Sequence, residues 1–235
     1  MVQLPRLYGI ADWAFLPTTA QLLAFVENLA AAGCTLIQYR NKSGNAKAML
    51  EQARELRKRL SSQSQNPHFS QNRGEVGHPQ SSDPRPGSRS AHNSVRLIMN
   101  DRADLCLACD LDGVHIGQED LTPDSVRKII GPHRWLGVST HNPEQIREAD
   151  LTSADYLAIG PVFATSSKEK PDPVVGLEGV RRARELTRKP LVAIGGITRA
   201  NAASVIEAGA DSVAVISDLL REPRKSAEEF LRILR

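Results

Sequence analysis

Short apolar segments alternate with amphipathic segments along almost the whole chain. The apolar segments are rich in Val, Ile, Leu and Ala, a composition typical of strands that are buried on both faces of a parallel sheet. The segments between them repeat apolar residues at helical spacing. This pattern predicts eight strands, at residues 7–12, 35–40, 95–100, 113–116, 135–139, 156–159, 191–194 and 212–215.

Capping residues mark several of the predicted helices. Thr18 or Thr19 can cap a helix that ends near Ala32, Thr122 precedes a helix at 123–130, and Asn142 precedes another that has proline at its first position. The other helices are predicted at residues 45–60, up to 109, 177–187, 201–208 and 227–234. Strands and helices that alternate eight times predict an α/β fold, a single (β/α)8 TIM barrel over residues 1–235, with its functional site at the carboxyl ends of the strands.

Residues 61–94 interrupt the pattern. They are dominated by Ser, Gln, Asn, Pro, Gly and His, and Phe69 and Val76 are their only sizeable apolar residues. Such a segment buries too little surface to offset its chain entropy, so we predict a disordered insert between the second helix and the third strand. Loop-closure entropy grows only with the logarithm of length, so a barrel can accommodate the insert.

Composition narrows the class of protein. The 235 residues carry a formal net charge of only +3, without the basic and aromatic clusters expected of a nucleic-acid-binding surface. No apolar run approaches the roughly 18 residues of a membrane span, and the amino terminus does not resemble a secretion signal. Three cysteines suit a reducing compartment better than a disulfide framework, so we expect a cytoplasmic protein.

Polar residues share one face of the second predicted strand and of the residues directly after it. Gln38, Arg40 and Lys42 alternate with Tyr39 and Asn41, and alternate residues of a strand share a face. Arg40 and Lys42 could be solvated loop cations. Gln38 would need a polar partner inside the barrel.

Two aspartates follow neighbouring strands. Asp101 ends the third strand and Asp120 lies after the fourth, and neighbouring strands are about 4.8 Å apart, so the two carboxylates could approach one cation. Two carboxylates with few other ligands suit Mg²⁺, which keeps several waters and binds substrate phosphate. The alternative is that each aspartate separately caps a helix.

Further residues suited to anions follow the later strands. Ser139 and His141 follow the fifth strand, and Thr165, Ser167 and Lys168 lie after the sixth. The loops after the seventh and eighth strands often bind phosphate in such barrels, and here they contain Gly195, Gly196, Ile216 and Ser217. Two anion sites, one of them metal-assisted, suit an enzyme that joins two phosphorylated substrates, and no activated nucleophile is evident. Cys106 and Cys109 are interpreted as structural thiols, and His115 as a hydrogen-bonded core histidine.

Seven motifs, in order along the chain, give the sequence a recognisable resemblance. It resembles the thiamine phosphate synthase family over nearly its whole length, except for residues 61–94. The motifs are QYRNK (38–42), MNDR (99–102), HIGQED (115–120), GVSTH (137–141), GPVFATSSK (160–168), IGGI (194–197) and VIS (215–217).

The resemblance implies a transferase that joins hydroxymethylpyrimidine pyrophosphate to a thiazole phosphate and releases pyrophosphate. It implies that residues matching Gln38 and Asn100 hold the pyrimidine and that Asp101 and Asp120 hold Mg²⁺. The residues implied to contact the pyrophosphate or the thiazole are Arg40, Lys42, Ser139, Thr165, Ser167 and Lys168, and those implied at the thiazole phosphate are Gly196, Ile216 and Ser217. An early break of the C–O bond would fit this set, because clustered cations stabilise departing pyrophosphate.

Two departures and two alternatives accompany the resemblance. Ser167 stands where the family usually has Thr, and Ala164 where it often has Pro. Serine keeps the hydroxyl, so we expect function to be retained. One alternative is the related thiazole tautomerase, which would use His141 as acid or base. The other is a non-catalytic phosphate-binding barrel. Proteins of this kind are commonly dimers, so a homodimer is also an expectation.

Overall fold

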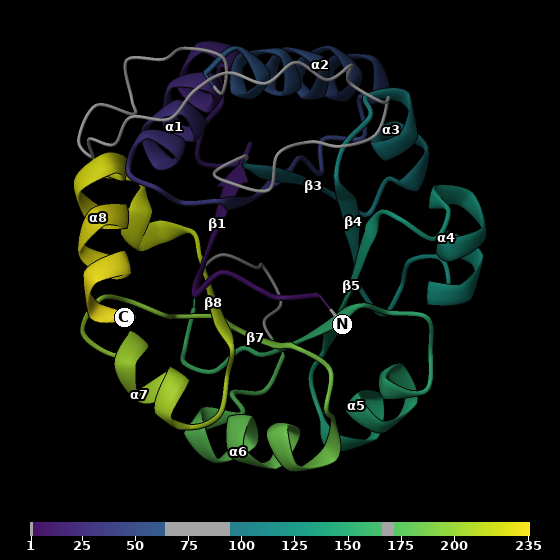
Figure 1. The fold of residues 1–235 in the computed structure, drawn as a ribbon, viewed down its shortest axis with the longest axis vertical. Coiled ribbons are helices and arrows are strands. Elements are labelled where there is room, and N and C mark those ends of the chain that lie inside the picture. The colour runs from purple at the N-terminus through teal and green to yellow at the C-terminus, as the bar shows by residue number, and fades with distance from the viewer. Residues whose placement is uncertain (1, 64–94, 166–171) are drawn as a thin grey trace, which may run out of the picture.

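Eight parallel strands close into a barrel in which each strand pairs with its neighbours in sequence, and β8 pairs with β1 (Figure 1). The computed structural model describes residues 2–63, 95–165 and 172–235. The predicted TIM barrel is therefore confirmed. The strands are β1 (Leu7–Asp12), β2 (Leu36–Arg40), β3 (Arg96–Asn100), β4 (Gly113–Ile116), β5 (Trp135–Thr140), β6 (Tyr156–Ile159), β7 (Leu191–Ile194) and β8 (Ser212–Val215).

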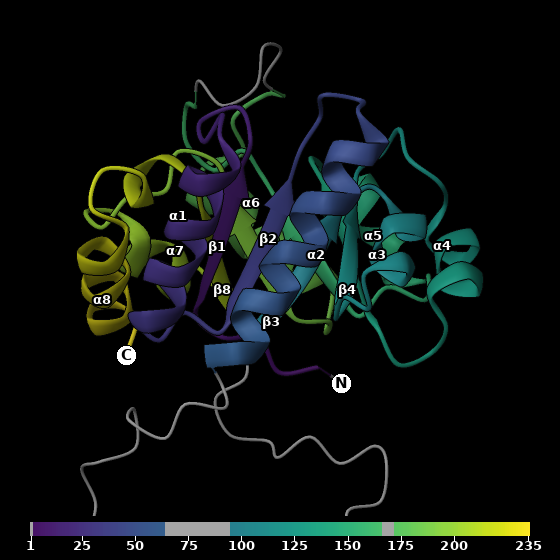
Figure 2. The same ribbon diagram turned by 90° about the horizontal axis from the view of Figure 1, so that it is seen from above.

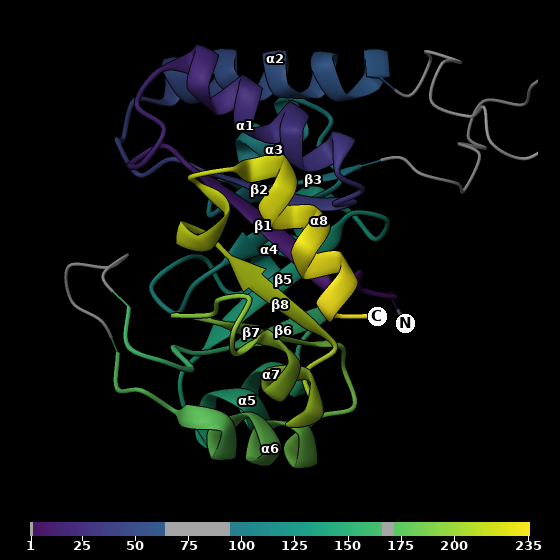
Figure 3. The same cartoon turned by 90° about the vertical axis from the view of Figure 1, so that its left-hand side faces the viewer.

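The helices form an outer ring around this barrel (Figures 1 and 3). Thr18 begins the first with a reciprocal capping box to Gln21, and Thr122 and Asn142 accept backbone N–H bonds at two later helices, as predicted. The helices are α1 (Thr19–Ala31), α2 (Ala46–Gln63), α3 (Ala103–Ala108), α4 (Pro123–Ile130), α5 (Pro143–Asp150), α6 (Gly176–Leu186), α7 (Ala202–Glu207) and α8 (Pro223–Ile233), with a short 3-10 helix, η2, at Ser217–Leu219.

Most predicted boundaries lie within one residue of the observed ones, but two helix boundaries were wrong by more than that. Helix α2 continues to Gln63, past the polar residues at which the insert was predicted to begin. Helix α8 begins at Pro223 rather than Ala227, because proline suits the first helical turn. Ser139, which was predicted to follow the fifth strand, instead lies within β5, which ends at Thr140.

The predicted insert lies mostly outside the described residues, which omit 64–94. Helix α2 ends and β3 begins at the face of the barrel where the strands start (Figure 2). This face is opposite the carboxyl ends of the strands.

Apolar side chains fill two layers. One cluster lies inside the barrel and includes Tyr8, Ile98, Tyr156 and Val192. The larger cluster lies between the strands and the surrounding helices and includes all three cysteines. Both faces of each strand are therefore buried, which explains why the strands read as continuous apolar runs.

Candidate active site

Strand β2 presents its polar residues in the alternation that the sequence predicted. Gln38 is 3% exposed, and its amide nitrogen donates to the Tyr8 hydroxyl at 2.9 Å. Gln38 therefore has the interior polar partner that it was expected to need. Tyr39 points to the opposite side, where it packs in the outer apolar layer and donates to Gln52.

Arg40 is held by a buried carboxylate. Its guanidinium forms an ion pair with Asp12 at the end of β1, and Asp12 is only 1% exposed. The neighbouring backbone is tied as well, since the Trp13 amide donates to the Arg40 carbonyl at 2.8 Å. Arg40 is thus a fixed cation at the carboxyl end of two adjacent strands, rather than a solvated loop residue.

Asp101 and Asp120 lie beside each other at the ends of β3 and β4. Burial raises the pKa of the Asp101 carboxyl, the nearby ammonium of Lys42 opposes this shift, and the Asp120 carboxylate adds to it. Lys42 Nζ is 3.2 Å from Asp101 Oδ2. The sequence prediction that Asp101 and Asp120 approach each other therefore agrees with the structure.

Neither aspartate caps the helix that follows it. The residue at the cap of α3 is Arg102, without a side-chain cap bond, and α4 is capped by Thr122. Asp120 instead accepts the Gly117 amide at 2.7 Å, and Asp101 has a left-handed backbone with φ of 62°. This conformation is uncommon for a residue with a side chain, although aspartate tolerates it better than most. The helix-cap interpretation is wrong for both residues.

Asn100 carries a buried polar atom without a partner. Its Nδ2 makes no hydrogen bond to the described protein, and the residue is 7% exposed. A buried donor of this kind costs free energy unless something accepts its proton. Asn100 is therefore suited to bind a ligand acceptor at the mouth of the barrel.

His115 is a hydrogen-bonded interior residue, as predicted. Its Nδ1 is 3.1 Å from the Tyr156 hydroxyl, and its Nε2 is 2.9 Å from Ser139 Oγ. Burial lowers the pKa of His115 to about 4, although the negative charge of Asp120 opposes the shift. The imidazole is therefore neutral at physiological pH.

The loops after β7 and β8 form the second part of the rim. Gly195 and Gly196 have φ of 98° and 63°, and a Cβ on Gly196 would lie 2.5 Å from the Ala164 carbonyl oxygen. Glycine is needed here because this loop packs closely on the loop after β6. Ser217 begins η2 directly after Ile216, and the first amides of a helix lack partners within it, which suits an anion.

Arg199 joins these two loops. Its backbone amide and its Nε both bond to Asp218 Oδ2, at 2.8 and 3.0 Å, and its guanidinium also bonds to Glu229 on α8. These carboxylates raise the pKa of Arg199. The sequence prediction did not include Arg199, because only the fold brings residues 199, 218 and 229 together.

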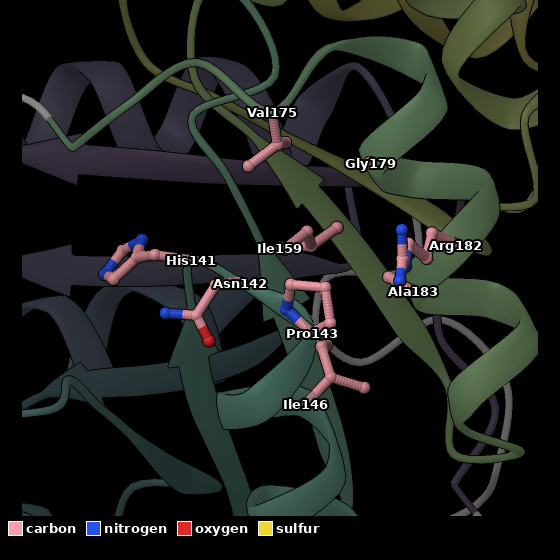
Figure 4. A pocket seen from close by; sticks show the side chains of 9 residues that line it. All are labelled: His141, Asn142, Pro143, Ile146, Ile159, Val175, Gly179, Arg182 and Ala183. Atoms are coloured by element: carbon pink, nitrogen blue, oxygen red, sulfur yellow. The ribbon is translucent and has the colours of Figure 1, made fainter.

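His141 lies beside a cavity of about 220 Å³ between α5 and α6 (Figure 4). Its Nδ1 is 2.6 Å from the Gly160 carbonyl oxygen, so this nitrogen donates, and its Nε2 is 3.5 Å from Asp172 Oδ2. Thr165 ends the preceding described segment. Ser167 and Lys168 lie outside the described residues.

The described residues also test the sequence interpretations of the cysteines, of a metal-binding cluster and of a membrane span. Cys106 and Cys109 are buried and unpaired, and burial raises the pKa of Cys106 to about 12, which fits structural thiols. No cluster of three or more metal-ligating side chains occurs in the described part of the chain. Within the same residues, no helix combines the length and apolar character needed to cross a membrane.

Comparison with known proteins identifies the family of this chain. A family model described as thiamine monophosphate synthase matches residues 88–219. The thiamine-phosphate synthase of Koribacter versatilis is 50% identical over 99% of this chain and 97% of its own length, and that of Shouchella clausii is 36% identical over 96% and 94%. A solved thiamine phosphate pyrophosphorylase from Pyrococcus furiosus superimposes with a TM-score of 0.75 at 31% identity, covering 97% of this chain and 95% of that one. The chain belongs to the thiamine monophosphate synthase family.

Proposed function

We propose that the polar rim at the carboxyl ends of the strands is where this protein carries out the reaction of its family. The reaction couples 4-amino-5-hydroxymethyl-2-methylpyrimidine pyrophosphate to hydroxyethylthiazole phosphate, giving thiamine phosphate and pyrophosphate. The observation that carries the proposal is the convergence of Arg40, Lys42, Asp101 and Asp120 at one edge of the barrel.

The pyrimidine would be held by Gln38 and Asn100. Gln38 donates to Tyr8 through its amide nitrogen, which leaves its carbonyl oxygen as an acceptor for the amino group of the pyrimidine. The unpartnered Nδ2 of Asn100 supplies a donor for a ring nitrogen. One acceptor and one donor together recognise the edge of an aminopyrimidine.

Asp101 and Asp120 would hold Mg²⁺. The donor set fits, since two adjacent carboxylates of like charge are unfavourable alone, and a hard divalent cation accepts such oxygens together with water and phosphate oxygens. When bound, the ion would neutralise part of the charge of the diphosphate.

The chain's own cations and hydroxyls would stabilise the leaving group. In a dissociative substitution the C–O bond breaks first, and its electron pair departs with pyrophosphate. Arg40 and Lys42 are held at the rim to receive this charge, and Ser139, Thr165, Ser167 and Lys168 would add donors. The thiazole nitrogen then forms the C–N bond with its own lone pair, so no protein base is required.

The thiazole phosphate would lie at Gly196, Ile216 and Ser217. The tight turn at Gly196 and the start of η2 bring backbone amides to the rim, and Arg199 fixes the two loops relative to each other. The relatives described above are all thiamine-phosphate synthases, so the tautomerase alternative with His141 gains no support from them.

Release of pyrophosphate from the two substrates tests the proposed roles. In saturating Mg²⁺, Asp101→Ala and Asp120→Ala should each lower turnover by about 100-fold or more while leaving the circular dichroism spectrum unchanged. Asp104→Ala is the matched control, because Asp104 is exposed and its carboxylate pairs with the neighbouring Arg102. Wild-type turnover by either of the first two variants would contradict the metal role.

Buried, unpaired cysteines accord with the proposed cytoplasmic location, since thiols persist in a reducing compartment. The proposed partners are the two small-molecule substrates. A homodimer stays a prediction.

A further inference from the structure

Five polar side chains from five different strands form a continuous hydrogen-bonded chain through the interior of the barrel. Gln38 Nε2 lies 2.9 Å from Tyr8 Oη, which lies 3.1 Å from Tyr156 Oη. Tyr156 Oη lies 3.1 Å from His115 Nδ1, and His115 Nε2 lies 2.9 Å from Ser139 Oγ. The chain thus joins the residue proposed to hold the pyrimidine to the hydroxyl proposed to contact the diphosphate.

The interior of the barrel is shaped around this chain. Tyr8 and Tyr156 are 1% and 0% exposed, and their rings pack edge to face with centroids 6.2 Å apart. Gly137 on β5 leaves the space that the Tyr156–His115 contact needs, since a Cβ there would lie 2.1 Å from Tyr156 Cζ and 2.4 Å from His115 Nδ1. The arrangement therefore depends on a glycine as well as on the polar groups.

The donors of this hydrogen-bonded chain all point in one direction, from Gln38 toward Ser139. The amide nitrogen of Gln38 can only donate, so the Tyr8 oxygen accepts. A buried hydroxyl proton without an acceptor is costly, so Tyr8 donates to Tyr156, and Tyr156 in turn donates to His115 Nδ1. The neutral imidazole then carries its proton on Nε2 and donates it to Ser139 Oγ.

We propose that this hydrogen-bonded chain positions the hydroxyl proton of Ser139 for the departing diphosphate. Because Ser139 Oγ accepts from His115, its own proton is free to point toward an anion. With the opposite tautomer, Ser139 would have to donate to Nε2 and would present only lone pairs to the diphosphate. Tyr8, Tyr156 and His115 are positioning residues in this arrangement, which rests on the role proposed above for Ser139.

The tautomer of His115 in the ligand-free protein tests the direction of the chain. Nitrogen-15 NMR of histidine-labelled protein at pH 8, with the His115 signals assigned from the loss of signals in His115→Gln, should show the Nε2–H form. Gln38→Glu should convert it to the Nδ1–H form, because a carboxylate can only accept and every bond of the chain must reverse. Adding Tyr8→Phe to Gln38→Glu should restore the Nε2–H form. An unchanged tautomer in Gln38→Glu, or an Nδ1–H form in the wild type, would overturn the inference.

Kinetics test whether the chain acts through Ser139. Tyr156→Phe should lower kcat about tenfold, the scale of a lost hydrogen bond to a charged group, with little change in KM. In a Ser139→Ala background, Tyr156→Phe should leave kcat almost unchanged, because the hydroxyl that the hydrogen-bonded chain positions is gone. Tyr39→Phe is the matched control, since it removes a buried tyrosine hydroxyl in the outer layer, where Asn41 keeps its 3.0 Å bond to Gln52.

The failures of the two proposals are distinguishable. If adding Tyr156→Phe to Ser139→Ala lowers kcat by a further factor of about ten, the positioning role is refuted and the proposed function is left intact. Wild-type kcat in Ser139→Ala alone would instead refute the role of Ser139 at the diphosphate. The NMR result requires no substrate and is independent of either kinetic outcome.

Discussion

The ion pair between Asp12 and Arg40 should stabilise the fold as well as orient the cation. Asp12 is 1% exposed and Arg40 is 19% exposed, and Asp12 also accepts the Ala14 amide at 3.1 Å. Removing one partner of such a pair leaves a buried charge without compensation. The appropriate experiment is a double-mutant cycle with Asp12→Asn, Arg40→Met and the combination, because methionine keeps much of the packing of the arginine stem.

The expected magnitudes follow from the exposure of each partner. Arg40→Met leaves the deeply buried Asp12 unpaired and should lower the free energy of unfolding by about 3 kcal/mol, near the lower end for broken buried pairs. Asp12→Asn should cost less, about 1–2 kcal/mol, because Arg40 retains some contact with solvent and asparagine still accepts the Ala14 amide. The double variant should be about 2 kcal/mol more stable than additivity predicts.

Urea denaturation measures these differences through the transition midpoint and slope. The same cycle on Arg147 and Glu144, which are 51% and 72% exposed, is the control and should give a coupling energy below about 0.5 kcal/mol. Asp12→Asn should also lower turnover about tenfold, because Arg40 keeps its charge but loses its anchor. Additive effects at Asp12 and Arg40 would refute the view that this pair is a coupled buried unit.

Three further outcomes are expected. The pKa of the Asp101 carboxyl is raised above 3.8 in the folded state, so the folded protein binds this proton more tightly than the unfolded chain does. Without metal, the free energy of unfolding should therefore fall as pH rises from about 4 through the raised pKa. The urea midpoints of Asp101→Asn should show a weaker fall over the same pH range. Gly196→Ala should cost about 2 kcal/mol or more in urea denaturation, because its φ is 63° and Ala164 is close; a smaller loss would contradict the tight approach. Deleting residues 63–92 should change turnover little, since α2 ends and β3 begins at the opposite face; a large loss in a folded deletion would contradict this placement.

Much of the architecture could be predicted from the sequence because it depends on local pattern. The strands at Leu7–Asp12, Gly113–Ile116 and Tyr156–Ile159 have the predicted bounds, since each is an apolar run between clear turn residues. Helix ends were predicted less accurately than strand ends. Helix α2 continues to Gln63 through polar residues that favour loops but also tolerate a final helical turn.

The candidate site was only partly predictable, for a different reason. Asp101 and Asp120 could be identified because each follows a strand, and the parallel barrel brings strand ends together. Gln38 could be identified because it is a polar residue within β2 that shares a face with Arg40. Asp12 and Arg199 gave no comparable signal, because a single aspartate or arginine in sequence does not reveal its partner. Their ion pairs join residues 28 and 19 positions apart.

The order of apolar and polar residues by itself determined the eight strands, most of the helices and the rim at which the chemistry is proposed, because periodicity and strand direction are local properties of the chain. Only closure of the barrel decided what lies inside it. Tyr8 and Tyr156 read as ordinary strand residues, yet their hydroxyls meet across the interior at 3.1 Å, 148 positions apart in sequence. Such a contact depends on how the strands are staggered around the barrel, which the sequence of each strand does not specify alone.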